Sequence, residues 1–167
     1  MNKNILVTTD FSISSLNLLK YVLENKLGNQ RHNIVLVYGY STSDSITDML
    51  FFSKSKVIDS LYNEAFEEGL SVLKNKFNSK IHIIRKDIFT GYNRGAFETF
   101  LQSNKIDFAF ISGSFVSNKN QKNSFDLRPF IKNSSIDYEE ISLYSEAFVP
   151  EKGELAELFQ SSFATSN

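Results

Sequence analysis

The sequence contains no cysteine and no tryptophan. The absence of cysteine excludes disulfide bonds, thiolate nucleophiles and zinc sites built on sulfur ligands. It also fits a reducing compartment, so we expect a cytoplasmic protein. No apolar run approaches the roughly 18 residues that a membrane-spanning helix needs. The opening segment MNKNILVTTD has too short an apolar core for a signal peptide. The sequence therefore predicts no membrane partner.

Neither sign of charge is in excess. The 18 Lys and Arg residues nearly balance the 19 Asp and Glu residues, which gives a net charge of −1. Because nucleic acids attract proteins with an excess of basic side chains, we expect no nucleic-acid partner. One loose basic cluster is interpreted as a solvated loop; it consists of Lys119, Lys122, Arg128 and Lys132.

The composition is typical of one folded domain, with 41% apolar and 22% charged residues in a chain of 167 residues. Residues 4–8 form a short, continuously apolar run, as expected of a strand covered on both faces. Three further segments are also predicted as strands, at 33–40, 81–89 and 107–111. Apolar residues spaced three and four apart predict helices between them, at 13–27, 58–77 and 96–101.

The last third of the chain carries weaker signals. Residues 115–135 are rich in Asn, Lys and Ser, and they predict a loop followed by a short helix at 127–131. A more polar fifth strand is expected between Ile141 and Val149, at an edge of the sheet. Pro150 then suits the first position of a final amphipathic helix.

Alternation of strands and helices predicts an α/β fold. We expect a Rossmann-like three-layer sandwich, with a five-stranded parallel sheet, helices on both faces and an extra C-terminal helix. The predicted domain covers residues 1–149, and the helix and tail cover 150–167. In such sheets ligands bind beyond the carboxyl ends of the strands. Candidate binding residues therefore lie at the ends of the first, second and fourth strands.

The first strand ends in Thr9-Asp10-Phe11-Ser12, and a Leu-rich helix containing Lys20-Tyr21 follows. This opening, together with the order of elements up to about residue 148, resembles the universal stress protein (UspA-like) family. The resemblance implies a Rossmann-like fold, a homodimer and, in many members, an ATP or AMP site. It also implies a phosphate loop after the fourth strand, of the form Gly-x-x-Gly, about nine residues, then Gly-Ser or Gly-Thr.

That loop is degenerate in this chain. Gly113 and Ser114 match its start, but Val116 stands at the second glycine and no later Gly-Ser pair follows. The segment Asn133-Ser134-Ser135 is the nearest polar substitute, and it lies too late in the chain. Glycines let the backbone approach phosphates, so their loss argues against tight ATP binding.

Part of the nucleotide site remains. Asp10 occupies the position that contacts the nucleotide in the family, although it also suits a turn or cap. Gly39 leaves room for an adenine or ribose, or else relieves crowding at a strand end. The candidate nucleotide-binding residues are Thr8, Thr9, Asp10, Tyr38, Gly39, Gly113 and Ser114.

Other chemistry finds little support. His32, expected in a loop, and His82, expected in a strand, have no second metal ligand at helical or hairpin spacing. No nucleophile motif is present, so we assign no catalytic residue. Four phenylalanines fall outside the core periodicity and would mark a contact surface if exposed; they are Phe11, Phe51, Phe52 and Phe115.

Three hypotheses follow. The preferred one is a non-catalytic regulatory or interaction domain, resembling a universal stress protein that has lost tight ATP binding and has a protein partner. The second is an ATP- or AMP-binding protein with an atypical phosphate loop. The third is an enzyme acting on a small molecule at the same strand ends.

Overall fold

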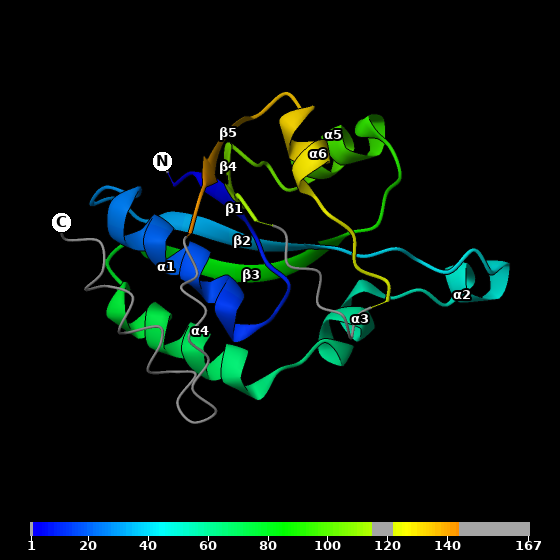
Figure 1. Ribbon diagram of the computed structural model, residues 1–167, viewed down its shortest axis with the longest axis horizontal. Helices are drawn as coiled ribbons and strands as arrows, with labels where there is room; N and C mark the ends of the chain where they lie inside the picture. Colours follow the sequence, from blue (N-terminus) through cyan, green and yellow to red (C-terminus); the bar gives the residue numbers. More distant parts are fainter. Residues whose placement is uncertain (1, 115–121, 144–167) are drawn as a thin grey trace.

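A computed structural model describes residues 2–114 and 122–143. Its elements follow one another as β1 (Asn4–Thr8), a 3₁₀ turn (Ile13–Ser15), α1 (Leu16–Asn25), β2 (His32–Gly39), α2 (Ile46–Leu50), α3 (Lys54–Ser60), α4 (Glu64–Lys76), β3 (Ile81–Phe89), α5 (Arg94–Ser103), β4 (Phe108–Ser112), α6 (Arg128–Lys132) and β5 (Asp137–Ile141) (Figure 1). The predicted final helix at 150–163 lies outside the described residues.

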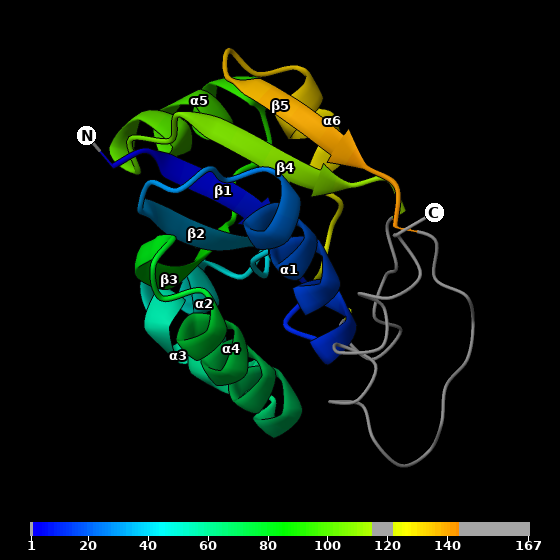
Figure 2. The same ribbon diagram turned by 90° about the vertical axis from the view of Figure 1, so that its left-hand side faces the viewer.

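All five strands are parallel, in the order β3-β2-β1-β4-β5 (Figure 2). Helices α1 and α4 cover one face of the sheet, and α5 and α6 cover the other (Figure 1). The predicted α/β fold, a five-stranded parallel sheet with helices on both faces, is therefore confirmed.

The central strands are apolar because both of their faces are buried. In β1 the residues Ile5, Leu6 and Val7 are at most 3% exposed. Ile5 and Val7 pack under α1 and α4, whereas Leu6 joins the core under α5 and α6. A strand covered on both sides has no solvent face to mark with polar residues, which explains why the continuous apolar runs located β1, β2 and β4.

The prediction of the fifth strand at 141–149 was wrong. The strand runs from Asp137 to Ile141 and pairs with β4 in the register Phe108↔Asp137 to Ser112↔Ile141. It lies at the sheet edge, as expected. Only Ile141 is buried in it, so its polar sequence gave little signal, and residues 144–149 of the predicted range lie outside the described residues.

The long helix predicted at 58–77 is two helices, α3 and α4. Between them Asn63 adopts an extended conformation and its Oδ1 accepts a hydrogen bond from the amide of Phe66 at 3.0 Å. This N-cap starts α4 and satisfies a backbone donor that a helix start leaves free. Apolar residues continue at helical spacing across the break between α3 and α4, so the sequence pattern did not reveal it. The polar stretch before α3 also contains α2, which was not predicted.

Candidate functional site

The sheet reverses its strand order between β1 and β4, so the carboxyl ends of these strands form the switch point where α/β folds bind ligands. Thr8 ends β1, and Ser112 ends β4. Tyr38 and Gly39 end the neighbouring strand β2. The structure thus brings the ends of these three strands to one edge of the sheet, as predicted.

Thr9 and Asp10 form a tight turn after β1. The amide of Thr9 donates to the carbonyl of Val37 at 3.0 Å, and its hydroxyl accepts from the amide of Phe11 at 3.0 Å. One oxygen of the Asp10 carboxylate, Oδ1, accepts from the amide of Ser12 at 2.8 Å and from its hydroxyl at 2.5 Å. Asp10 therefore holds the turn that leads into the first helix.

Phe11 follows this turn with a φ of 58°, in the left-handed region that non-glycine residues rarely adopt. Its side chain is only 4% exposed. Its ring contacts those of Tyr38 and Phe66, with centroids 5.6 and 5.5 Å apart. Packing of the aromatic ring offsets the backbone strain, so Phe11 belongs to the core rather than to a contact surface.

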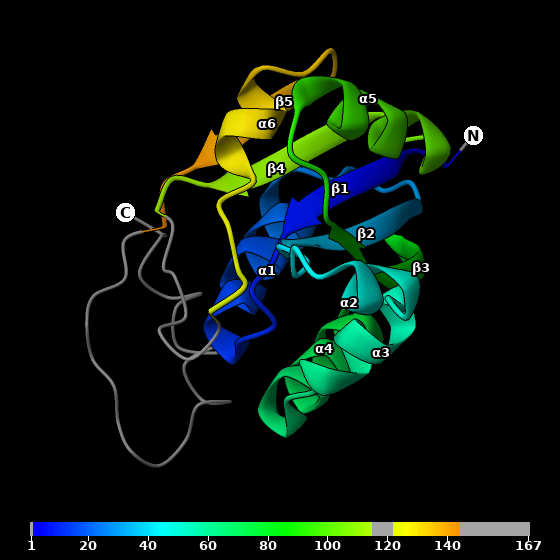
Figure 3. The ribbon, with the colours of Figure 1, turned by 90° about the vertical axis from the view of Figure 1, so that its right-hand side faces the viewer.

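The end of β2 is covered by the chain that precedes α6 (Figure 3). The amide of Phe125 donates to the carbonyl of Gly39 at 3.1 Å, and the amide of Ser41 donates to the carbonyl of Asn123 at 2.7 Å. Tyr40 and Ser124 form an antiparallel bridge between these contacts. We call residues 123–125 the β2 cover. Sequence reasoning missed it, because nothing in a polar loop marks it as a sheet partner.

The β2 cover occupies the space that Gly39 was expected to leave for a nucleotide. A Cβ placed on Gly39 would lie 2.4 Å from the carbonyl oxygen of Phe125 and 3.1 Å from its ring. Glycine is therefore required here by the close approach of the chain's own backbone. Of the two interpretations offered for Gly39, the structural one accounts for its surroundings.

Tyr38 lies beneath the β2 cover with 3% of its surface exposed. Burial raises the pKa of its phenol, a hydrogen bond with Ser124 partly opposes this, and the charge of Asp10 raises the pKa further. The side chains of Asp10 and Ser124 thus both lie near the phenol of Tyr38.

After β4, Gly113 is held between β5 and α6. Its amide donates to the carbonyl of Ile141 at 2.8 Å, and its carbonyl accepts from Nη1 of Arg128 at 2.9 Å. The Nε and Nη2 atoms of Arg128 bind the carboxylate of Asp126 at 2.8 to 3.0 Å. This charge pair raises the pKa of Arg128. The amide of Ser114 contacts the hydroxyl of Ser112 at 3.4 Å.

Two of the four residues of the predicted basic cluster form ion pairs. Arg128 pairs with Asp126, and Lys132 lies 2.6 Å from Glu140. Lys119 and Val116, the residue expected to block a phosphate loop, lie outside the described residues.

In the polar segment 133–135, the amide and hydroxyl of Ser135 donate hydrogen bonds to the carboxylate of Glu98 in α5 at 2.8 and 2.6 Å, so this segment is bound to α5.

The two histidines lie at opposite extremes of exposure. His32 was expected in a loop; it is instead the first residue of β2 and is 8% exposed. His82 is exposed on β3. Within residues 2–114 and 122–143, no group of three or more His, Asp or Glu side chains is close enough to hold a metal ion. None of the helices in these ranges is long and apolar enough to cross a membrane.

Of the four phenylalanines outside the core periodicity, Phe51 is exposed; it lies directly after α2. Phe51 is 77% exposed, and three apolar residues of α2 accompany it: Ile46 at 77%, Met49 at 58% and Leu50 at 76%. We call these four residues the α2 patch. Figure 1 shows α2 at one extremity of the molecule, away from the sheet. Phe52 is half-buried, and Phe115 lies outside the described residues.

No family model matches this chain, and no curated protein matches it in sequence. Solved structures match it in fold. Protein MJ0577 is 17% identical, with 86% of this chain and 97% of that chain covered and a TM-score of 0.51. The universal stress protein UspA from Lactobacillus plantarum is 16% identical, with 83% and 97% covered and a TM-score of 0.50. This chain therefore has the fold of the universal stress proteins.

Proposed function

We propose that this protein is a non-catalytic regulatory or interaction domain of the universal-stress-protein type, which does not bind ATP tightly and works through a protein partner in the cytoplasm. The α2 patch carries the proposal. Four large apolar side chains, each more than half exposed, stand together at one extremity of the molecule. Such patches on soluble proteins mark surfaces that another protein covers.

The strand ends support the loss of tight nucleotide binding. The β2 cover fills the space above Gly39 with backbone and an aromatic ring. The carboxylate of Asp10 already accepts two hydrogen bonds from Ser12. A nucleotide would have to displace the cover, so its net binding energy would be small.

The thermal midpoint with and without millimolar ATP and magnesium tests this part. A ligand at 100 times its Kd stabilises the folded state by about 2.7 kcal/mol, which is about 5 to 10 °C for a chain of this size. We expect a shift below about 1 °C, which corresponds to a few tenths of a kcal/mol. A shift of several degrees that Asp10→Ala abolishes would instead establish the alternative, an ATP- or AMP-binding protein.

The interaction part is tested by changing the α2 patch. The double variant Leu50→Ser, Phe51→Ser removes two exposed apolar side chains from a helix end that contributes nothing to the buried core. We expect it to keep the wild-type thermal midpoint and to lose self-association or partner capture, measured by sedimentation velocity and by pull-down. Equal association of the wild type and the variant would refute a role for this patch. A homodimer, which the resemblance implied, is one outcome of the same sedimentation experiment.

A further inference from the structure

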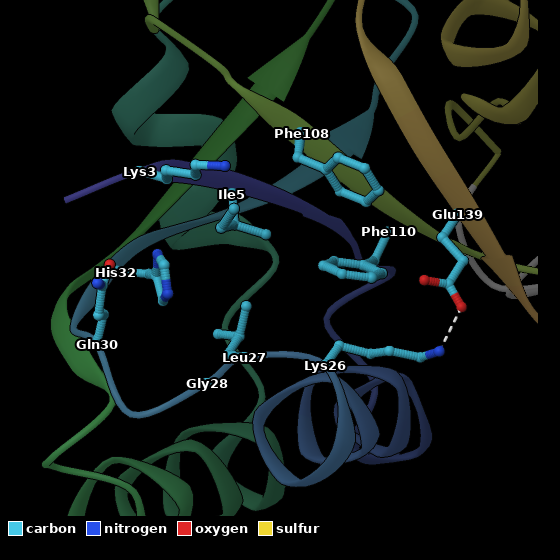
Figure 4. A pocket seen from close by; sticks show the side chains of 10 residues that line it. All are labelled: Lys3, Ile5, Lys26, Leu27, Gly28, Gln30, His32, Phe108, Phe110 and Glu139. Atoms are coloured by element: carbon cyan, nitrogen blue, oxygen red, sulfur yellow. Dashed lines mark ion pairs between the residues drawn. The ribbon is translucent and has the colours of Figure 1, made fainter. Parts of the chain in front are cut away.

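A hollow lies at the amino ends of the strands, opposite the carboxyl ends described above. It has a volume of about 430 Å³, which is within the range of small-molecule sites. Its walls come from the amino ends of β1, β2 and β4, from the loop after α1 and from β5 (Figure 4). We call it the amino-end pocket; its lining includes Lys3, Ile5, Lys26, Leu27, His32 and Phe110.

One wall of the amino-end pocket is apolar. Ile5, Leu27 and Phe110 are buried, and Phe108 is half-buried. The rings of Phe108 and Phe110 lie with their centroids 4.9 Å apart. Figure 4 shows the Phe110 ring facing the space between Leu27 and Ile5. This wall suits the body of an aromatic or aliphatic molecule.

The rest of the pocket is basic. Lys3 and Lys26 line it, and Nζ of Lys26 is held by Glu139 at 2.5 Å. Counting these three charges, the lining has an excess of one positive charge. The side chain of Lys26 is 29% exposed in this pair.

His32 forms the inner end of the pocket. Its side chain is more than nine-tenths buried, and Nδ1 has no hydrogen-bond partner among the described residues. Buried polar atoms without a partner are rare in folded proteins and call for an explanation. Burial and the nearby charge of Lys3 lower the pKa of His32, which leaves the imidazole neutral and able to donate one hydrogen bond.

We propose that the amino-end pocket binds a small carboxylic acid with an aromatic or aliphatic body. Lys3 and His32 contact its carboxylate, and Leu27 and Phe110 pack against its body. The site lies at the amino ends of the strands, away from the carboxyl ends at which α/β folds bind ligands. It is independent of the proposed function.

The test compares an acid with its neutral counterpart. The full chain, labelled with ¹⁵N, is titrated with indole-3-acetate and, separately, with indole-3-acetamide. We expect the acid to shift the amide resonances of Gly28, His32 and Phe108, with the amide compound binding at least fivefold more weakly. Lys3→Gln is expected to weaken binding of the acid by a similar factor. The matched control Lys74→Gln removes an exposed positive charge from α4, outside the pocket, and is expected to leave binding unchanged.

Two outcomes would overturn the proposal. The first is the absence of shifts at these residues with millimolar acid. The second is equal binding of the acid and the amide, which would reduce the pocket to an apolar patch.

Discussion

The amide of Phe125 donates a hydrogen bond to the carbonyl of Gly39 at 3.1 Å, although the two residues belong to segments far apart in the sequence. The contact places a polar loop against the end of β2. The space next to Gly39, where a nucleotide was expected to fit, is therefore filled by the chain itself. The same close contact requires glycine at position 39.

Gly39→Ala should destabilise the protein by about 1 to 3 kcal/mol, the usual cost of overpacking. The new Cβ would lie 2.4 Å from a backbone oxygen, which cannot move aside as a flexible side chain can. Urea unfolding measures the difference. Gly28→Ala is the matched control, since a Cβ there meets nothing within 4 Å. The control should be neutral or gain up to about 1 kcal/mol. Equal stabilities of the two variants would show that the β2 cover does not press on Gly39.

Asp10→Ala should lower the free energy of unfolding by about 1 to 2 kcal/mol, because it removes the acceptor for two donors of Ser12. Asp10→Asn keeps an oxygen acceptor at the same place. Its loss in the free energy of unfolding should therefore be less than half of the loss caused by Asp10→Ala. Chemical denaturation of both variants checks this. Equal stability of Asp10→Ala and the wild type would show that the carboxylate of Asp10 does not stabilise the turn, and would favour a role in ligand binding.

Lys105→Gly should stabilise the protein by about 1 kcal/mol. Lys105 follows the C-cap of α5 with a φ of 51°, and the amides of Lys105 and Ile106 donate to the carbonyls of Gln102 and Leu101. This is the Schellman arrangement, in which glycine is the favoured residue. Lys105→Ala removes the same charge but keeps the Cβ, so its thermal midpoint should not rise. A gain of equal size in both variants would point to charge instead of backbone strain.

Stability should fall on acidification, in part through His32. Burial lowers the pKa of this histidine in the folded state, so the unfolded chain takes up a proton first as the pH falls. The stabilising contribution is complete above the unfolded pKa of about 6.5 and is lost as the pH falls through the folded value. His32→Gln should flatten the pH dependence of the unfolding free energy between pH 7 and pH 5. In an NMR titration, the pKa of His32 should lie below about 6.5, the value of an unperturbed histidine. A pKa at or above that value would contradict this prediction.

Sequence patterns located four of the five strands, including β3, in which only Ile81, Ile88 and Phe89 are buried. The runs at 4–8, 33–40 and 107–111 are apolar because both sheet faces are covered, so they marked β1, β2 and β4. The edge strand β5 was misplaced because its polar side chains are free to face water. The break between α3 and α4 depends on a single capping residue, Asn63, which an apolar stripe does not reveal.

Local chemistry along the chain was sufficient to predict the α/β class, the parallel sheet and the turn role open to Asp10, since these depend on neighbouring residues and on burial of repeating faces. Only the tertiary structure decided that Phe125 covers Gly39, that His32 is buried near the charge of Lys3, and that the α2 patch is exposed. Each of these features depends on contacts between segments that are far apart in the sequence. Such contacts leave no periodic pattern in the local sequence, so only the tertiary structure reveals them.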